Sequence, residues 1–270
     1  PLTFPHILLQ NAQKFPAGKI AMREKDYGIW QSYSWQDYLD QVRDFSLGLA
    51  ALGFKKDDKM AIIGDNRPQL YWGLAACQCL GGVPVPLYQD AIHDELAYIV
   101  DHSECKFALA EDQEQTDKLM HLKEEIPRIE YIIYDDPRGL RNYKHDWLVA
   151  FTDVQEMGRK FDREHPDYFM NAVNAVDPDD MSIISYTSGT TGKPKAAMLS
   201  HRNLFFAVQA LRQYNTFSPG ANYLSYISPA WITEQFLALC GGVWVPLILH
   251  FPEKPETVQV DIRDIAPEIV

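Results

Sequence analysis

The sequence has 270 residues, of which 46% are hydrophobic and 23% are charged, a composition typical of a globular protein with a large apolar core. Its net charge of −12 and pI near 5.1 argue against nucleic acid as a partner, because affinity for a phosphate backbone depends on dense lysine and arginine. The four cysteines and eight histidines show no paired zinc-ligand spacing, so a metal site built from protein nitrogen or sulfur is not expected.

No stretch has the pattern of a signal peptide or the uninterrupted apolar length of a transmembrane helix. The longest apolar run, 236–251, is broken by the glycine pair at 241–242 and by Pro246, and we interpret it as a helix, a tight turn and a buried strand. The cysteines are interpreted as reduced core residues, which predicts a cytoplasmic location. Nothing in the sequence indicates an oligomeric state.

The first half of the chain alternates amphipathic helical patterns with short apolar strand patterns. The clearest helix begins after Ser34, a capping residue followed by Asp37 in the first turn, and it stops at Gly53. The predicted helices are 4–15, 34–52, 66–80, 94–102 and 113–125, and the predicted strands are 20–24, 30–33, 60–63, 83–88, 107–110 and 131–134. This alternation predicts a doubly wound α/β fold with mainly parallel strands.

The second half begins with an irregular segment, 135–180, whose helical patterns at 147–161 and 168–173 we interpret as an excursion between two sheet systems. The elements predicted after it are strands 181–186, 196–199, 223–227 and 243–249, helices 201–214 and 232–240, and a short helix leading into a strand over 261–270. The pattern of 81–87 recurs at 241–247, each time after a strand and a proline-opened helix. This suggests one strand–helix–strand unit per sheet, with chance use of Gly-Gly at helix ends as the alternative.

One segment between two predicted strands carries an unusual combination of groups. Residues 186–195 read Tyr-Thr-Ser-Gly-Thr-Thr-Gly-Lys-Pro-Lys. Glycines at 189 and 192 let the backbone take positive φ and direct N–H groups toward one point, while the hydroxyls and Lys195 add further donors. The segment therefore predicts a phosphate-binding loop, and a merely polar hairpin is the alternative.

This loop differs from the P-loop of ordinary nucleoside triphosphatases. Only two residues separate Gly189 from Gly192, and Pro194 follows Lys193 where that motif has Ser or Thr at the start of a helix. Proline also disfavours helical geometry at the residue before it. A different nucleotide chemistry is implied.

The segment resembles the signature loop of the adenylate-forming (AMP-binding) enzymes, Tyr/Phe-Thr-Ser-Gly-Ser/Thr-Thr-Gly-x-Pro-Lys-Gly, and matches it from Tyr186 to Lys195. Ala196 replaces the last glycine, which puts in doubt any role that needs a bare backbone there. Similarity extends over most of the chain, and Ser-Pro-Ala-Trp-Ile-Thr-Glu-Gln at 228–235, together with 23–25 and 264–267, resembles the long-chain acyl-CoA synthetases.

For the fold, the resemblance implies two doubly wound, mainly parallel sheets flanked by helices, as in the N-terminal domain of an adenylate-forming enzyme. Residues 1–175 would form a first α/β subdomain with an excursion at about 135–180, and residues 176–270 would begin a second subdomain that carries the phosphate loop. The family's adenine, ribose and hinge motifs and its C-terminal domain with the catalytic lysine would follow Val270. We therefore expect no catalytic residue in this chain and no turnover by it alone.

For the activity, the resemblance implies an acid–thiol ligase that uses ATP, Mg²⁺ and coenzyme A to activate a long-chain fatty acid. The acid and ATP would give an acyl-adenylate and pyrophosphate, and the acyl group would then pass to coenzyme A. These partners are small molecules, and a hydrophobic acid is compatible with peripheral membrane contact. Two alternatives stay open: an adenylate-former for short, aryl or amino acids, and a non-catalytic nucleotide- or protein-binding domain.

The resemblance also assigns roles to individual residues. The residues assigned to the β- and γ-phosphates of ATP are Thr187, Ser188, Gly189, Thr190, Thr191, Gly192 and Lys195. Thr190 would lie near Mg²⁺, and Lys193, at a variable position, is expected to be a solvated charge. Trp231 and Glu234 are assigned to the acyl-substrate pocket, with a core tryptophan and a helix N-terminal carboxylate as the respective alternatives.

Overall fold

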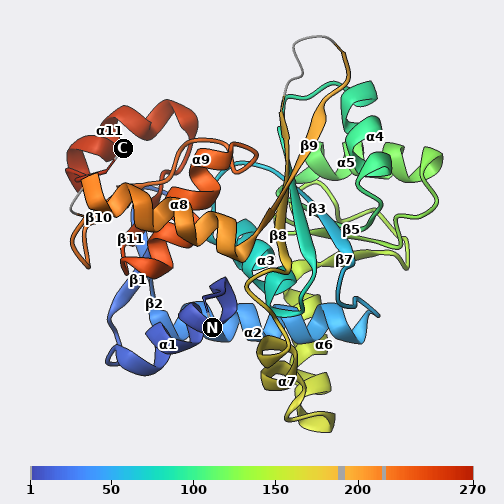
Figure 1. Cartoon of the computed structure of the whole chain (residues 1–270). Coiled ribbons are helices and arrows are strands. Elements are labelled where there is room, and N and C mark those ends of the chain that lie inside the picture. The colour runs from blue at the N-terminus through green and yellow to red at the C-terminus, as the bar shows by residue number, and fades with distance from the viewer. Residues whose placement is uncertain (1, 188–191, 215–216, 270) are drawn as a thin grey trace.

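The structure is a computed structural model that describes residues 2–187, 192–214 and 217–269 (Figure 1). Helices and strands alternate along most of this length, which confirms the predicted α/β class. The strands of the described residues form a five-stranded sheet, a four-stranded sheet and a two-stranded hairpin.

The five-stranded sheet is parallel throughout and has the strand order β4-β3-β5-β6-β7. Its strands are β3 (Lys59–Ile63), β4 (Val83–Leu87), β5 (Cys105–Ala110), β6 (Tyr131–Tyr134) and β7 (Leu148–Ala150). The helices between them are α3 (Pro68–Cys79), α4 (His93–His102) and α5 (Gln113–Glu125). Because the chain runs from β3 outward to β4 and then crosses to β5 on the other side, the sheet is doubly wound, as predicted. The short strand β7 was not predicted.

Alternate side chains of this sheet enter two separate cores. On β3, Met60 and Ile62 pack in the core shared with α3 and with α2 (Trp35–Ala51), whereas Ala61 and Ile63 pack in the core shared with α4 and α5. This division follows from the two-residue period of a strand. Burial of both faces explains the near-continuous apolar runs from which these strands were predicted.

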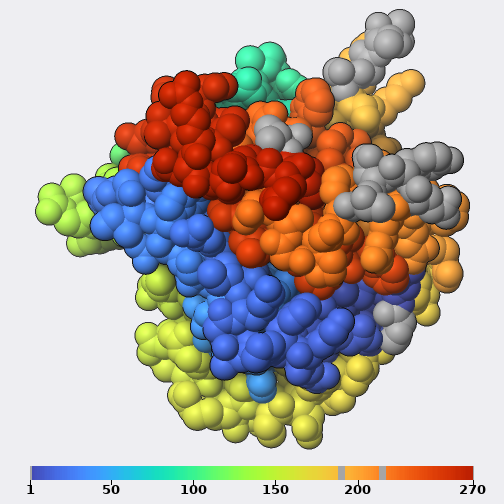
Figure 2. Space-filling model, turned by 90° about the vertical axis from the view of Figure 1, so that its left-hand side faces the viewer, coloured from blue at the N-terminus to red at the C-terminus, as the bar shows by residue number. Residues whose placement is uncertain are grey.

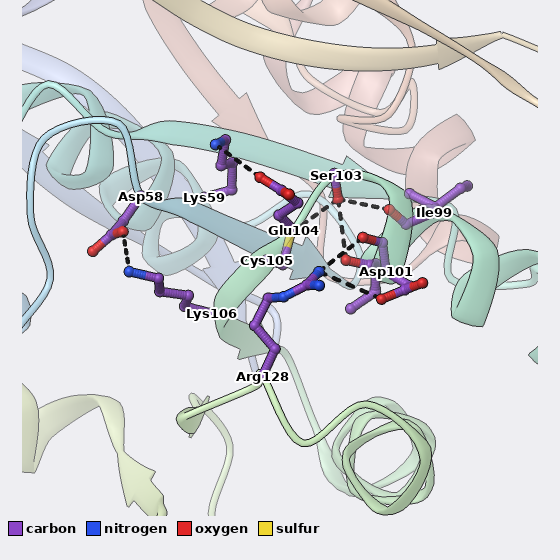
Figure 3. Close-up of polar contacts among 10 residues, drawn as sticks. Asp58, Lys59, Ile99, Asp101, Ser103, Glu104, Cys105, Lys106 and Arg128 are labelled. Carbon is purple, nitrogen blue, oxygen red and sulfur yellow. Dashed lines mark hydrogen bonds and ion pairs between the residues drawn. The ribbon is translucent and has the colours of Figure 1, made fainter.

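The amino-terminal edge of the same sheet is held by ion pairs (Figure 3). Lys106 Nζ lies 2.6 Å from a carboxylate oxygen of Asp58, so the start of β5 is joined to the residue before β3. Lys59 and Glu104 form a second, longer pair of 3.8 Å between the same two strands. These groups are partly exposed, so we expect each pair to contribute less than about 1 kcal/mol to stability.

The four-stranded sheet combines segments from the two ends of the chain. Its order is β10-β11-β1-β2, built from β1 (Ile20–Asp26), β2 (Ile29–Ser34), β10 (Asn222–Leu224) and β11 (Ile248–Phe251). β1 runs parallel to β11 with Met22 opposite Leu249, and β2 returns antiparallel to β1. The predicted boundary near residue 175 therefore does not separate the sheets, and the division into subdomains stays a prediction.

The contact between the chain ends continues beyond the strands. α11 (Val258–Ile265) lies beside the β1–β2 hairpin, and Figure 2 shows these red and blue segments adjoining on one face. Lys25 Nζ lies 2.7 Å from a carboxylate oxygen of Asp261, which is fully buried, and 2.7 Å from one of Asp264. The sequence segments 23–25 and 264–267, noted separately for their resemblance, thus meet in the fold.

The excursion at 135–180 contains α6 (Phe151–Glu164) and α7 (Tyr168–Asn174). α6 packs against α2 at a crossing formed by glycines of both helices. A Cβ atom on Gly158 would lie 1.8 Å from the backbone oxygen of Asp44, and one on Gly48 would lie 2.0 Å from the backbone oxygen of Val154. The two backbones are therefore in direct contact, which no other residue type allows without moving a helix.

The glycine pair at 241–242 does not end a helix, which corrects the prediction. Gly81, the counterpart in the first half, has φ +69° and terminates α3. Gly241 and Gly242 instead have helical φ values of −63° and −55°. The helix continues as α9 (Ile232–Glu234), a π-helix η1 (Gln235–Gly241) and α10 (Gly242–Trp244), and the strand begins only at Ile248. The strand–helix–strand order is still repeated with parallel strands, as β10 and β11 show.

The remaining described helices are α1 (Phe4–Lys14), α8 (His201–Tyr214) and a short 3-10 turn at Pro255–Thr257. All four cysteines are buried and free, and burial raises the pKa of the Cys77 thiol well above its usual range. Within the ranges that the structure describes, none of the helices combines the length and apolar character needed to cross a bilayer.

Candidate active site

The predicted phosphate loop connects two antiparallel strands, β8 (Met181–Thr187) and β9 (Lys195–Ser200). Thr187 and Lys195 are opposite each other in the pair next to the turn, and both are exposed. The predicted placement of the loop between two strands is confirmed. The assigned residues Ser188, Gly189, Thr190 and Thr191, including the predicted contact to Mg²⁺, lie outside the described residues.

Gly192 has the backbone conformation that was predicted for the loop glycines. Its φ of +149° is one that side-chain-bearing residues rarely adopt. None of the described atoms lies within 4 Å of the position that a Cβ would take, so the backbone conformation, and not packing, requires glycine here. The arrangement fits an anionic ligand, because Thr187 and Lys195, both exposed, lie opposite each other and Gly192, between them in the chain, has a positive φ.

The turn end of this hairpin contacts α4. The Tyr186 hydroxyl lies 2.8 Å from Nδ1 of His102, and burial raises the pKa of Tyr186 to about 12. The Lys193 ammonium is exposed and lies 4.7 Å from the centre of the Tyr98 ring. Ala196 pairs with Tyr186 across the hairpin and packs against the core, so the methyl group that replaces the family's glycine is accommodated.

Trp231 is 55% exposed, so the alternative that it is a core residue is wrong. It immediately precedes α9, and its indole lies near the phenol of Tyr88, the residue after β4. Trp231 therefore lies at the carboxyl edge of the five-stranded sheet. Its assignment to the substrate pocket stays a prediction.

Glu234 is fully buried, in contrast to Trp231. Its carboxylate accepts hydrogen bonds from the hydroxyls of Tyr71, Tyr223 and Ser225, each over 2.5 Å. Burial raises the pKa of Glu234 to about 6, although these donors favour the ionised form. Glu234 lies in the first turn of α9, as the alternative of a helix N-terminal carboxylate expects, but among the described residues no capping hydrogen bond is made there.

His201 is the first residue of α8 (His201–Tyr214). It is buried, and its Nδ1 accepts a weak hydrogen bond of 3.4 Å from the backbone N–H of Phe4. Burial lowers the pKa of His201 to about 4, so the ring is neutral at physiological pH. This arrangement suits a packing role.

Sequence reasoning missed a cleft of ≈ 810 Å³ at the carboxyl ends of strands from both larger sheets. Polar residues that follow these strands line it, and in a parallel sheet such residues collect at one edge. Their position directly after the predicted strands was the available signal. The lining residues include Glu24, Asn66, Arg67, Glu111, Asp135, Arg138, Tyr226 and Glu253.

The Arg67 guanidinium lies among several carboxylates on the cleft wall. Arg67 lies 2.5 Å from Glu111 and 3.3 Å from Asp135, which follow β5 and β6. Burial raises the pKa of Asp135 to about 6 against the opposing effect of Arg67, and burial also raises the pKa values of Glu24 and Glu111. The guanidinium therefore holds together the carboxylates that follow two neighbouring strands, β5 and β6.

We expect Arg67→Met to lower the free energy of unfolding by about 2 kcal/mol at neutral pH, because it leaves partly buried carboxylates unpaired. The folded-state pKa of Asp135, about 6, lies above its usual 3.8, so the folded protein binds more protons and this group's contribution to stability falls as pH rises between these values. Without Arg67 these folded-state pKa values rise further. Urea unfolding should therefore show that Arg67→Met loses less free energy of unfolding near pH 5 than at neutral pH.

Arg138→Met is the matched control for Arg67→Met. Arg138 pairs with Asp136 on the same cleft wall, but its side chain is 77% exposed. We expect a change below about 1 kcal/mol at either pH. Equal losses in the two variants, or a loss that does not depend on pH, would contradict the role assigned to Arg67.

A family model described as AMP-binding enzyme matches residues 8–269 of this sequence. The chain belongs to the AMP-binding enzyme family. The described hairpin therefore carries the family's signature loop, and the cleft beside Asn66 and Tyr226 is a cleft of an AMP-binding domain.

Individual relatives of this AMP-binding chain are distant. A human long-chain-fatty-acid–CoA ligase is 24% identical over 251 residues, which cover 92% of this chain and 36% of the relative. The 4-hydroxybutyrate–CoA ligase 2 of Metallosphaera sedula is 28% identical over 209 residues, covering 76% of this chain and 36% of the relative. The chain thus spans about a third of the length of these relatives.

Among solved structures, the o-succinylbenzoate–CoA synthetase of Bacillus subtilis in complex with its acyl-adenylate intermediate superposes with a TM-score of 0.71 at 19% identity. The match covers 98% of this chain and 60% of that structure. At this level of identity the match shows that the two proteins share a fold over nearly the whole length of this chain.

Proposed function

We propose that the whole protein is an AMP-forming acyl-CoA synthetase that acts on fatty acids. A carboxylate oxygen of the acid would attack the α-phosphorus of ATP, the bond to pyrophosphate would break, and the thiol of coenzyme A would then displace AMP from the acyl carbon. The signature loop on the β8–β9 hairpin carries this proposal, because holding pyrophosphate and neutralising its charge is the main electrostatic requirement of the first step.

The described part of the loop supports a phosphate-binding role. The Lys195 ammonium would bind a β- or γ-phosphate oxygen, and the Thr187 hydroxyl and the backbone at Gly192 would donate from the other side of the turn. The same role is proposed for Ser188, Gly189, Thr190 and Thr191. A Mg²⁺ ion bound to the phosphates, which we propose to lie near Thr190, would supply further charge neutralisation.

A narrow apolar cavity, the apolar seam, supports the proposal that the substrate carries a hydrocarbon chain. It lies between α8, the π-helix η1 and the four-stranded sheet, and its free volume is only ≈ 10 Å³, about the space that one water molecule needs. π-helical turns often occur at functional sites, because they leave part of the helix less regularly bonded. We propose that an acyl chain enters here when η1 moves. The seam is lined by residues that include Val208, Leu211, Phe217, Phe236, Leu237, Val245 and Leu247.

Trp231 is proposed to contact the acid, since its exposed indole stands at the carboxyl edge of the sheet near Tyr88. Glu234 was predicted to line the same pocket. Its buried contacts support a different role.

The test is acid-dependent exchange of labelled pyrophosphate into ATP by the whole protein, measured from acetate to stearate. We expect exchange to rise with chain length, and no exchange by residues 1–270 alone. A preference for short or hydroxylated acids would favour the second candidate, an adenylate-former for another acid, which the similarity to a 4-hydroxybutyrate ligase supports. Absence of exchange with every acid would refute both.

A further inference from the structure

The Glu234 carboxylate joins elements of the two larger sheets. Tyr223 and Ser225 donate to it from β10 and the residue after it, and Tyr71 donates from α3, which covers the other sheet. Asn66, in the loop between β3 and α3, adds a longer contact of 3.3 Å. A single side chain thus contacts three separate parts of the fold.

The hydrogen bonds around Glu234 form a connected array. The Tyr71 and Ser225 hydroxyls are 2.9 Å apart, and the Asn66 side-chain amide donates to Ser225 over 2.8 Å and to the backbone oxygen of Ile227 over 2.8 Å. Among the described residues, the groups that donate to this carboxylate are neutral hydroxyls and an amide, so the buried charge is stabilised by hydrogen-bond donors. Since a buried charge with missing donors is very unfavourable, the array favours only one relative placement of these elements.

The segment between Ser225 and Glu234 is held at both ends and along its length. The Gln235 amide donates to the backbone oxygen of Pro229 over 2.5 Å, and the Ser185 hydroxyl donates to that of Ala230 over 3.3 Å. The segment carries two exposed aromatic side chains, Tyr226 on the cleft wall and Trp231 beside Tyr88.

We propose that Glu234 is a positioning residue, whose carboxylate fastens the segment 225–233 to α3 and Asn66 and thereby fixes Tyr226 on the cleft wall and Trp231 near Tyr88. It does not contact substrate itself. The positioning is a property of the folded chain, whereas its consequence for acid binding rests on the proposed function.

The array also makes the position of this segment depend on pH. The groups that face Glu234 are Tyr71 from α3, Tyr223 and Ser225 from β10 and its end, and Asn66 from the loop after β3. Burial raises the pKa of Glu234 to about 6 and raises the pKa values of Tyr71 and Tyr223 well above their usual range, so only the carboxyl group titrates near neutrality. When it takes up a proton, one hydroxyl must turn from donor to acceptor.

The test uses the chain labelled with 5-fluorotryptophan and ¹⁹F NMR, with Trp231→Phe to assign the Trp231 resonance. In the unmodified chain we expect this resonance to titrate with a midpoint near pH 6. In Glu234→Gln, which keeps the shape of the side chain, we expect a shifted resonance that no longer titrates in this range. In Glu234→Ala, which removes all four contacts, we expect a larger shift and faster amide exchange over 225–233.

Thr116→Val is the matched control. It removes a buried α5 hydroxyl that donates to the backbone oxygen of Asp112, the residue before α5, at a site that shares none of these contacts, with little change of volume. It should lower stability without moving the Trp231 resonance. If Glu234→Ala does not fold, Glu234→Gln alone tests the proposal. A Trp231 resonance in Glu234→Gln that has the same position and the same titration as in the unmodified chain would overturn the proposal.

These readouts need neither ATP nor acid, so they separate the positioning role from the proposed function. In the whole protein, misplaced aromatic side chains should raise the KM for the acid on the order of tenfold in Glu234→Gln, with a smaller effect on kcat. A shifted Trp231 resonance in a protein that activates no acid would leave the positioning intact and refute the proposed function.

Discussion

Gly158→Ala should destabilise the protein by about 3 kcal/mol, one of the two largest effects that we expect. The new methyl group would lie 1.8 Å from the backbone oxygen of Asp44 and 2.7 Å from the backbone nitrogen of Gly48. Backbone atoms cannot turn aside as a side chain does, so α6 must move away from α2 and the contacts around the crossing loosen. The gain of about 1 kcal/mol in helix propensity on replacing glycine offsets only part of this loss.

The free energy of unfolding in urea, followed by circular dichroism, measures this effect. Gly242→Ala is the control, since Gly242 is also helical but its added methyl group would meet only the end of the Leu249 side chain, at 3.3 Å. We expect Gly242→Ala to lower the free energy of unfolding by less than about 1 kcal/mol. Gly48→Ala alone should resemble Gly158→Ala, and the double variant should lose less than the sum, because one displacement of α6 makes room for both methyl groups. Full additivity would contradict the shared crossing.

Lys195→Ala should reduce acid-dependent pyrophosphate exchange by the whole protein about 100-fold, the loss typical of removing one donor from a developing anion. Lys195 lies opposite Thr187 in the pair next to the turn of the hairpin, where its side chain is exposed. The variant should keep its stability for the same reason. Binding of inorganic pyrophosphate to residues 1–270, measured by calorimetry, should weaken in parallel.

Lys193→Ala is the control for Lys195→Ala, because it removes the same charge two residues away. The Lys193 ammonium lies over the Tyr98 ring on α4, so it is not assigned to the phosphates. We expect less than about a twofold change in exchange. Similar losses in the two variants would show that the loop attracts anions only by its overall charge.

Much of the fold could be predicted from local patterns. Ser34 caps α2 with Asp37 in the first turn, as predicted, and the alternation from β3 to β6 gives the doubly wound parallel sheet. These signals depend on residues close together in the chain. The glycine pair at 241–242 shows where such local signals fail. A Gly-Gly pair ends α3 at 81–82, but the same pair at 241–242 lies within a continuing helix, because the surrounding packing differs.

The candidate site was only partly predictable for the same reason. The hairpin that carries the signature loop is local, and its placement is confirmed. The cleft, the pairing of Lys25 with Asp261 and the partners of Glu234 join residues far apart in the sequence. Nothing in a linear pattern marks a glutamate near a helix start as the acceptor for tyrosines on two other elements, since its charge predicts an exposed side chain.

The pairing of β1 with β11 has a consequence for how this protein is made. The strand at Ile20–Asp26 is synthesised early, yet its parallel neighbour at Ile248–Phe251 emerges from the ribosome only after more than two hundred further residues. The five-stranded sheet, contiguous from Lys59 to Ala150, can assemble during that interval. The edge of β1 that later pairs with β11 meanwhile exposes backbone N–H and C=O groups without strand partners. Nascent chains should therefore need protection at their amino-terminal hairpin until translation has passed β11.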